Sequence, residues 1–161
     1  KRRLFIVVTA IVCVALAFAL TGCSESEDSY MDEADMTVGY LTTDYADQLM
    51  ADGANTILGS VSIDETDGVY TVTVTEKEVV HSSDYADGYY IAETNVVEQY
   101  GLGGYAKIIY ADENGEDIIG NADGFIKNHN EDTEQLYTVY YMNDTVELIV
   151  PVAPEDVEVT Y

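Results

Sequence analysis

Apolar and polar residues alternate along much of the chain after residue 55, which is the pattern of β-strands with one buried face. In residues 60–63 and 70–75, Val, Ile or Tyr occupies every second position, and Ser or Thr lies between. Asp67-Gly68 separates the two segments and is a dipeptide that favours tight hairpin turns. The pattern therefore predicts a β-hairpin over residues 60–75.

The remaining strand signals are shorter and are separated by turn residues. Asn143-Asp144 is expected to form the turn of a second hairpin, and Pro151 is expected to end its second strand, because proline cannot donate to a sheet ladder. With this hairpin included, the further predicted strands are residues 89–93, 105–110, 117–119, 136–142, 145–150 and 157–161.

One segment before the strands carries the spacing of a helix. Thr43 is a favourable N-terminal cap, and Tyr45 and Leu49 lie four residues apart on one helix face. Gly53 then follows as a common helix stop. The sequence therefore predicts a helix that begins after Thr43.

A second, shorter helix is predicted between the strands, with Asn121 as its cap and with Phe125 and Ile126 as its apolar residues. Together the elements predict an α+β to mainly β fold. It is expected to be a small antiparallel sheet, a barrel or roll, with an N-terminal helix and one short interposed helix. The order strand–strand–strand–helix–strand–strand is also that of an OB-fold.

The N-terminal segment contains basic residues, an apolar run and a cysteine in that order. Lys1-Arg2-Arg3 precedes Leu4–Leu20, a run of 17 residues without charge, as in secretory signal peptides. The run ends at Leu20-Thr21-Gly22-Cys23, which resembles the lipobox of bacterial membrane lipoproteins. The resemblance implies transfer of diacylglycerol to the Cys23 thiol and cleavage before this residue. A permanent transmembrane helix is the alternative, because the run stands at the short limit for spanning a bilayer.

This resemblance divides the chain into three predicted parts. Residues 1–22 are the signal peptide, residues 23–42 are the lipidated cysteine with an acidic tether, and residues 43–161 are a single ectodomain. Six carboxylates and few apolar residues in the segment 24–38 favour a tether without packed structure. The protein is accordingly expected at the cell membrane or cell surface, on the extracytoplasmic side, held by the lipid on Cys23.

Acidic side chains dominate the composition after Cys23. All 31 Asp and Glu residues follow this cysteine, against three lysines, which gives that part a formal net charge of −28. Such a field repels phosphates and anionic lipid headgroups, so nucleic acid is excluded as a partner and the lipid is the expected link to the membrane. A protein, peptide or glycan ligand stays open. Cys13 lies in the predicted signal peptide, so no disulfide is expected, and no cofactor is indicated.

No motif indicates a catalytic or cofactor-binding residue, but one acidic loop approaches a calcium-binding pattern. Asp112, Asn114, Glu116 and Asp123 fall on oxygen-ligand positions of an EF-hand frame. The sixth position, where the sharp turn requires glycine, is Asp117, and an Asn114-Gly115 hairpin turn accounts for the same residues. The four residues are therefore weak metal candidates, and no metal is expected.

The two histidines offer a second metal hypothesis. His81, Asp84 and Asp87 are spaced three residues apart and on a helix would share one face. They follow a predicted strand, so an exposed loop is the expected structure. His129, with the acidic residues that follow it, is interpreted in the same way.

Three functions are compatible with these features. The first is a lipid-anchored, non-catalytic domain that binds a ligand or has a structural role in the envelope. The second is a surface hydrolase that uses paired carboxylates, and the third is a calcium-stabilised interaction module. A cleft with two desolvated carboxylates would favour the hydrolase, whereas solvent-exposed carboxylates would favour the binding domain.

Overall fold

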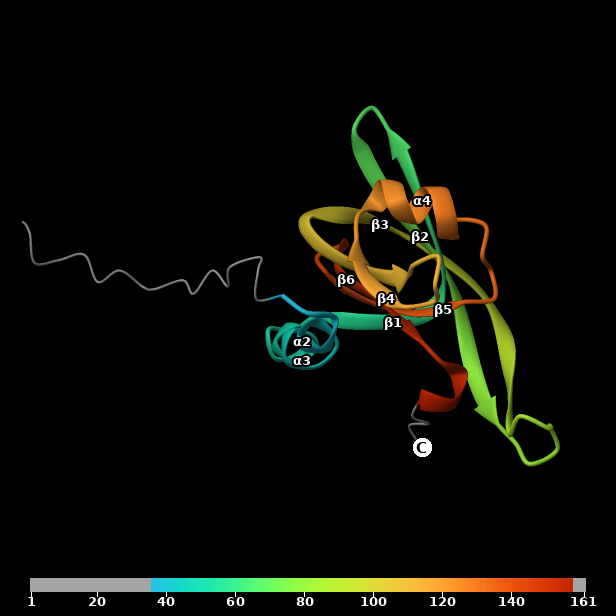
Figure 1. The fold of residues 1–161 in the computed structure, drawn as a ribbon. Helices are drawn as coiled ribbons and strands as arrows, with labels where there is room; N and C mark the ends of the chain where they lie inside the picture. The colour runs from blue at the N-terminus through green and yellow to red at the C-terminus, as the bar shows by residue number, and fades with distance from the viewer. Residues whose placement is uncertain (1–35, 158–161) are drawn as a thin grey trace, which may run out of the picture. The chain divides into compact units, whose positions relative to one another are not determined.

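Residues 36–157 are described by the computed structural model. The predicted signal peptide, Cys23 and residues 23–35 of the predicted tether lie outside the described residues, as do residues 158–161 of the predicted last strand. In chain order the elements are α2 (Val38–Tyr40), the π-helix η2 (Leu41–Tyr45), α3 (Ala46–Ala51), β1 (Asn55–Thr66), β2 (Val69–His81), β3 (Tyr89–Ala111), β4 (Asp117–Gly120), α4 (Ala122–His129), β5 (Leu136–Met142), β6 (Thr145–Val152) and the 3-10 helix η3 (Pro154–Asp156) (Figure 1).

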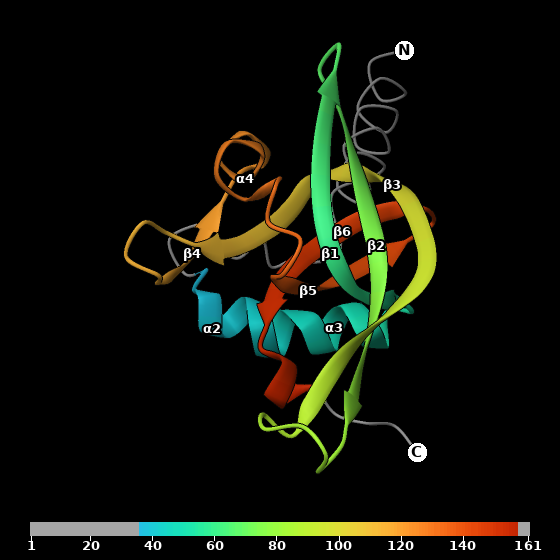
Figure 2. The ribbon, with the colours of Figure 1, turned by 90° about the vertical axis from the view of Figure 1, so that its right-hand side faces the viewer.

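Five of the strands close into a barrel. β1 pairs with β2 and β5, β6 lies between β5 and β3, and a β2–β3 pairing completes the ring. β4 extends the sheet on the far part of β3 (Figure 2). All pairings are antiparallel except that of β3 with β6, which is parallel.

The predicted α+β to mainly β fold, with its N-terminal and interposed helices, is confirmed. The ring of pairings corresponds to the barrel alternative, while the parallel pair makes the sheet mixed rather than purely antiparallel. The barrel is similar to an OB-fold in two respects. It has five strands, and α4 lies in the chain between the third and fourth of them, β3 and β5.

Two predicted hairpin turns are confirmed. They consist of Asp67-Gly68 between β1 and β2 and of Asn143-Asp144 between β5 and β6. All four residues have positive φ, between 49° and 79°. This is the backbone of the two-residue turns whose twist matches that of the flanking strands.

β3 is longer than the sequence indicates. The predicted strands at residues 89–93 and 105–110 belong to one strand of 23 residues, so the prediction of two separate strands is wrong. The intervening segment contains three glycines, which are poor strand formers and hide the continuity; they are Gly101, Gly103 and Gly104. A bulge also interrupts the segment, where Asn95 adopts a φ of 61° and the register with β2 shifts.

Pro151 does not end its strand, contrary to the prediction. It lies inside β6, paired with Tyr137 of β5. The last residue of β6 that pairs with β3 is Ile149, so one edge of β6 is free of β3 at the proline. A proline is tolerated at such an edge, because its missing N–H leaves no ladder bond unmade.

The barrel interior is filled by side chains from all five strands and from α4. Phe125 of α4 has no exposed surface, and its ring packs edge-to-face against Tyr137 and Tyr110, at centroid distances of 5.4 and 5.9 Å. Asn121 caps α4 as predicted, accepting a hydrogen bond from the Gly124 N–H at 2.8 Å. The buried residues of this interior core are Ile57, Val61, Ile63, Val72, Val74, Tyr100, Ile108, Tyr110, Ala122, Phe125, Tyr137, Val139, Val146 and Ile149.

A second apolar cluster lies outside the barrel, between the N-terminal helix and the β3–β6 pair. Its buried members are Leu41, Ala46, Leu49, Ala54, Ile109 and Leu148. In β3, Ile108 belongs to the interior core and Ile109 to the outer cluster; in β6, Ile149 belongs to the interior core and Leu148 to the outer cluster. All four residues are at most 2% exposed. The sheet is therefore buried on both faces at this point, as parallel pairs usually are.

The N-terminal helix begins earlier than predicted. It starts at Val38, where the Thr37 hydroxyl accepts a hydrogen bond from the Tyr40 N–H at 3.1 Å. Thr43 lies inside the helix and donates its hydroxyl to the Gly39 carbonyl at 2.8 Å, so the prediction of Thr43 as the cap is wrong. Residues 41–45 form a π-turn, which breaks the 3.6-residue spacing that a sequence pattern can detect.

Asn130 ties the end of α4 to β1. Its amide oxygen accepts from the Ile63 N–H at 2.6 Å, and its amide nitrogen donates to the Ile63 carbonyl at 3.0 Å. β1 pairs with β5 only over residues 55–59. The Asn130 side chain therefore supplies both hydrogen bonds that a neighbouring strand would have made at Ile63.

We predict that Gly124→Ala destabilises the fold. A Cβ at Gly124 would lie 2.1 Å from the hydroxyl oxygen of Tyr110, whose side chain is 6% exposed. Glycine to alanine inside a helix ordinarily stabilises by up to about 1 kcal/mol. Here the buried ring has to shift, so the free energy of unfolding should fall by about 1–3 kcal/mol in denaturant titrations.

Two matched variants separate the clash from other effects. Tyr110→Phe removes the atom that clashes, so it should restore most of the stability when combined with Gly124→Ala. Gly104→Ala is the control, because a Cβ there meets nothing within 4 Å, and its effect should stay within about 0.5 kcal/mol. Wild-type stability of the single Gly124→Ala variant would contradict this packing of Tyr110 on α4.

Candidate functional site

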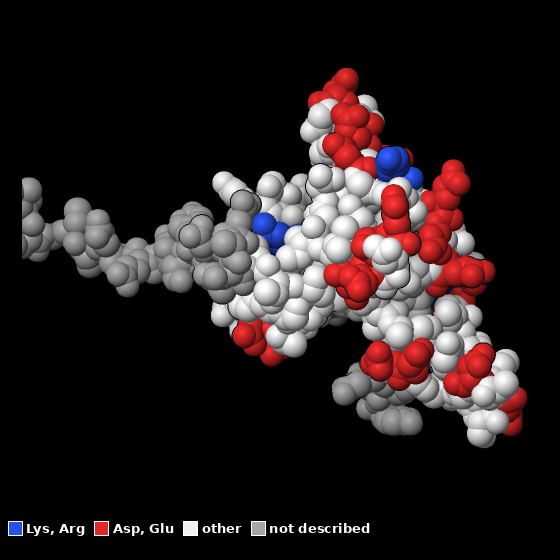
Figure 3. All heavy atoms as spheres, viewed as in Figure 1, with Lys and Arg blue, Asp and Glu red and all other residues white. Residues whose placement is uncertain are grey.

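Carboxylates are spread over the surface rather than gathered in one patch. On the face in Figure 3, Asp and Glu occur on the projecting β1–β2 hairpin and around the periphery, with few Lys or Arg between them. Lys77, one of the three bases after Cys23, forms an ion pair with Glu93. The negative charge therefore produces a field over the surface as a whole rather than at one site. The place where a ligand can bind depends on local geometry.

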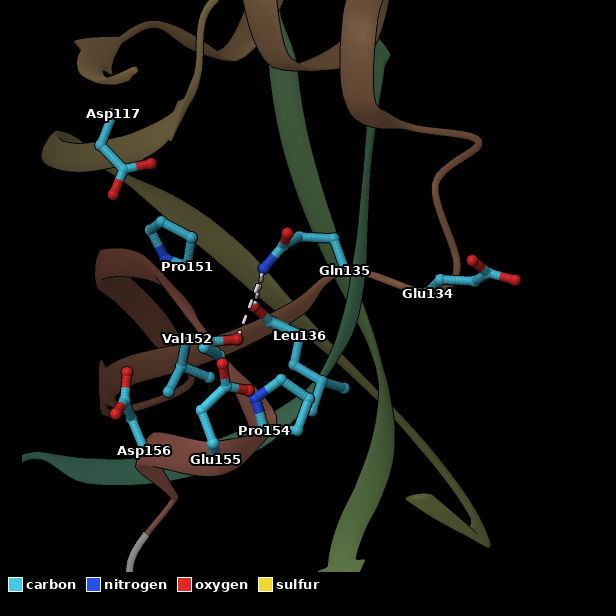
Figure 4. Close-up of a pocket in the computed structure, with 10 residues that line it drawn as sticks. Asp117, Glu134, Gln135, Leu136, Pro151, Val152, Pro154, Glu155 and Asp156 are labelled. Carbon is cyan, nitrogen blue, oxygen red and sulfur yellow. Dashed lines mark hydrogen bonds between the residues drawn. The ribbon is translucent and has the colours of Figure 1, made fainter. Parts of the chain in front are cut away.

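A cleft of about 550 Å³ lies where the start of β5, the end of β6, β4 and η3 meet (Figure 4). The strands β5 and β6 supply its middle, and η3 follows β6 directly along one side. Its lining residues are Asp117, Glu134, Gln135, Leu136, Pro151, Val152, Ala153, Pro154, Glu155 and Asp156.

Four acidic residues from three segments line this cleft, and all four are exposed. In Figure 4 the side chains of Asp117, Glu155 and Asp156 lie on the same side as Pro151, whereas Glu134 extends away. The cleft therefore combines prolines and aliphatic residues with acidic residues that are open to water.

Gln135 fixes the middle of the cleft. Its amide nitrogen donates to the Leu136 carbonyl at 2.8 Å and to the Val152 carbonyl at 3.5 Å, and Figure 4 shows both bonds. The bonds hold the start of β5 to the end of β6, where Leu136 pairs with Val152. The carboxamide is thereby oriented before any ligand arrives.

The cleft offers hydrogen-bond acceptors, and the ionisable side chains that line it are carboxylates. Among the described residues that line it, none is Ser, Thr, Cys, His or Lys. Tyr137, beside Leu136 in β5, is buried; this burial and then the charges of Asp132 and Asp117 raise its pKa, so its phenol stays protonated. Exposed carboxylates beside proline and aliphatic residues suit a ligand with a cationic group.

The acidic loop with the calcium-like spacing forms the β3–β4 turn. The Asp112 carboxylate accepts hydrogen bonds from the N–H groups of Asn114 and Glu116, at 2.8 and 2.9 Å, and from the Asn114 side chain at 3.1 Å. These bonds lower the Asp112 pKa, the Glu116 N–H first among them. Gly115 has a φ of 80°, as the turn requires. The carboxylate is thus occupied by donors of its own turn.

The structure does not bring the four candidate calcium ligands together. Asp123 lies on α4, and its carboxylate accepts from the Tyr70 hydroxyl at 2.8 Å, which raises the pKa of that phenol. Asp112, Asn114 and Glu116 share the turn described above. Within residues 36–157, no group of three or more His, Cys, Asp or Glu side chains is arranged to hold a metal ion.

Both histidines contact other parts of the fold. His81 ends β2, with its Nε2 at 3.1 Å from the Val157 carbonyl, and the loop of residues 82–88 that follows is largely exposed, as predicted. His129 ends α4 and packs its ring against Tyr110 at 4.8 Å and Phe125 at 5.7 Å. His129 therefore extends the aromatic cluster of the interior core, and the expectation of an exposed loop is wrong for this residue.

No pattern in the sequence predicts the cleft. Its lining comes from three segments, at residues 117, 134–136 and 151–156, which only the fold brings together. The nearest local signal is the stretch Pro151–Asp156, where two prolines are followed by two acids. That composition alone is equally typical of a solvated loop.

Comparison with known proteins gave no match: no family model, no curated protein and no solved structure matches this chain. None of the helices in residues 36–157 is long and apolar enough to cross a membrane.

We predict that Asp112→Ala loosens the β3–β4 turn to the same extent with and without calcium. The carboxylate accepts hydrogen bonds from N–H groups of its own turn, so the melting temperature of the variant should fall equally in CaCl2 and in EDTA. A CaCl2 concentration of about 1 mM is suitable, because extracellular calcium sites fill at this concentration. Glu113→Ala, an exposed neighbour outside this hydrogen-bond set, is the control. A loss seen in calcium alone would show instead that the loop binds the ion.

The effect of Asp112 should also depend on pH in a defined direction. Its native pKa lies below the ordinary value of 3.8, so the folded state favours the charged carboxylate. The stabilisation is therefore present above that value and is lost as pH falls through the lower native pKa. Melts between pH 2 and pH 7 should show the wild type and Asp112→Ala converging at the acidic end of this range.

Proposed function

We propose that this protein is a lipid-anchored, extracytoplasmic surface domain that binds a cationic protein or peptide segment without catalysis. The observation that carries the proposal is the cleft lined by four exposed acidic residues, of which three, Asp117, Glu155 and Asp156, extend their side chains on the same side (Figure 4). The acidic character of the rest of the chain supports the same ligand class, because its field attracts cations and slows the approach of anions.

Attachment to the membrane is supported by the sequence of residues 1–23. A basic start, an uncharged run and the lipobox-like Leu20-Thr21-Gly22-Cys23 follow one another at the spacing of lipoprotein signals. Two acyl chains on one cysteine are sufficient for stable attachment, whereas a single chain gives only marginal binding. The acidic residues after Cys23 would then separate the binding domain from the headgroups.

The exposure of the carboxylates at the cleft favours binding over catalysis. A carboxylic acid that protonates a leaving group at neutral pH needs burial or a close second carboxylate to raise its pKa. The rim residues are exposed to water, and the lining described above adds a carboxamide and apolar side chains. A ligand-binding role therefore requires fewer additional assumptions than the hydrolase alternative.

The membrane part of the proposal predicts that Cys23→Ala abolishes lipidation. The variant should remain an unprocessed precursor or leave the membrane fraction, since the acceptor thiol is missing. Mass spectrometry of the membrane fraction should find a diacylglycerol-modified Cys23 at the terminus of the wild-type protein. An unmodified, uncleaved cysteine in the wild type would refute lipid attachment.

The binding part predicts that neutralising the cleft weakens binding of a cationic peptide. The double variant Glu155→Gln with Asp156→Asn should reduce affinity for a labelled lysine octapeptide about threefold to tenfold at 0.15 M NaCl, as expected for two exposed charges. Fluorescence anisotropy measures the affinity, and a Gly-Ser octapeptide of equal length should not bind.

A charge-matched control tests the location of this site. Glu113→Gln with Asp67→Asn removes the same two charges from turns that do not line the cleft. This control should keep nearly wild-type affinity. Equal losses in both double variants would mean that the peptide senses only the overall field, and the cleft would lose its role.

A further inference from the structure

β3 contains a wide bulge at the point where it passes from one neighbouring strand to the next. Its pairing with β2 ends at Gly101, and its pairing with β4 begins at Ile108. On the other edge, the pairs that Leu102 and Lys107 form with β6 are separated by five residue steps on β3 and by two on β6. Residues 103–106 therefore have no partner strand on either edge within the described chain. We call these four residues the β3 bulge.

The β3 bulge leaves backbone hydrogen-bonding groups unused. Gly103 lies close against β6, because a Cβ there would be 2.9 Å from the Val146 carbonyl oxygen. In the middle of the bulge, Gly104 and Tyr105 form no backbone hydrogen bond with another element of the described chain. Their N–H and C=O groups are therefore open to water or to a ligand.

A groove of about 490 Å³ lies at the β3 bulge, and its volume is in the range of small-molecule sites. The start of β2 lines it with Val69 and Tyr70, and the start of α4 lines it with Asn121 and Ala122. The other lining residues belong to β3 and its bulge, except for Gly68 of the β1–β2 turn. The groove is thus formed where the ladder between β2 and β3 ends.

The groove has an uncharged lining in a highly acidic chain. Among the described residues that line it, none is Asp, Glu, Lys, Arg or His. Lys107 lies between two lining residues of β3, but it pairs with Leu148 of the second apolar cluster, so its side chain faces the outer side of the sheet. The carboxylates of Asp67 and Asp123 follow from residues next to the lining in sequence, and Glu147 lies opposite the bulge in β6. An anion is repelled here and a cation finds no opposite charge within the lining, so the groove favours an uncharged ligand.

The groove presents both apolar surface and hydrogen-bonding groups. Val69 is 65% exposed, and Tyr70 is held in place by its hydroxyl, which donates to the Asp123 carboxylate at 2.8 Å. The Asn121 side-chain oxygen accepts from the Gly124 N–H, so its amide nitrogen is the group left to donate to a ligand. A saccharide ring matches this combination, because its C–H faces are apolar and each of its hydroxyl groups both donates and accepts hydrogen bonds.

We propose that the groove at the β3 bulge binds an uncharged saccharide. An apolar face of one sugar ring would lie against Val69 and Tyr70. Its hydroxyl groups would form hydrogen bonds with the free backbone groups of Gly104 and with the amide of Asn121. This site goes beyond the binding of a cationic segment proposed above, and it is distinct from the acidic cleft, with which it shares no lining residue.

The test titrates trisaccharides into the full chain, kept in a polyoxyethylene detergent that contains no sugar, and measures binding by calorimetry. The uncharged probes are triacetylchitotriose, cellotriose and maltotriose, and at least one should bind with a Kd of about 1 mM or tighter. Chitotriose without acetyl groups is cationic and should bind no more tightly than its acetylated form. Hydrogen exchange should show new protection of the Gly104 and Tyr105 amides. Failure of all three uncharged probes to bind, or a preference for the cationic one, would overturn the proposal.

Variants locate the saccharide on the molecule. Asn121→Asp keeps the cap of α4, since Asp and Asn cap helices about equally well, but it removes the amide donor and puts a charge into the groove. Binding should weaken at least tenfold, whereas Asn128→Asp, the same change at an exposed position of α4 outside the groove, should bind as the wild type does. If Asn121→Asp unfolds, Val69→Asp places a charge on the β2 wall and should have the same effect. Unchanged binding by a folded groove variant would overturn the proposal.

Two further outcomes separate this site from other interpretations. Glu155→Gln with Asp156→Asn should leave trisaccharide binding unchanged; a loss there, with the groove variants unaffected, would assign the saccharide to the acidic cleft and overturn the proposal. Protection of the Gly104 and Tyr105 amides on concentrating the protein without saccharide would assign the groove to a second copy of the chain and likewise overturn it.

Discussion

The architecture depends on β3, which pairs with three other strands. β3 pairs with β2 in its first half, with β6 in its middle and with β4 at its end. It completes the ring, because it pairs with both β2 and β6, which do not pair with each other in the described chain. Both apolar clusters take residues from it, Tyr100 and Ile108 inside and Ile109 outside. Any distortion of β3 is therefore transmitted to the barrel and to both helical coverings.

This dependence explains which parts of the fold sequence patterns could predict. The Asp67-Gly68 and Asn143-Asp144 turns are local, since two residues with positive φ define each of them. The Asn121 cap and Phe125 of α4 are local in the same sense. By contrast, the continuity of β3 across its glycines is imposed by strands on either side, which no window of sequence contains.

The errors at helix and strand ends have the same physical origin. Thr43 has the chemistry of a cap, but a π-turn continues the helix through it and sets Leu41 and Ala46 five residues apart on the buried side. Pro151 has the chemistry of a strand stop, but β3 has already left that edge of β6. The acidic cleft likewise arises from tertiary contacts between segments that carry no common motif.

The parallel β3–β6 pairing also has a consequence for the order of events during folding. β6 is the last barrel strand in the chain, and in the sheet it lies between β5 and β3. The pairing of β1 with β5 joins residues that are even farther apart in the sequence. Pairings between such distant residues carry a large loop-closure entropy and form slowly. Both of these pairings come from the β5–β6 hairpin, which pairs with β1 through β5 and with β3 through β6. A change that separates this hairpin from the sheet therefore opens the barrel along two seams at once.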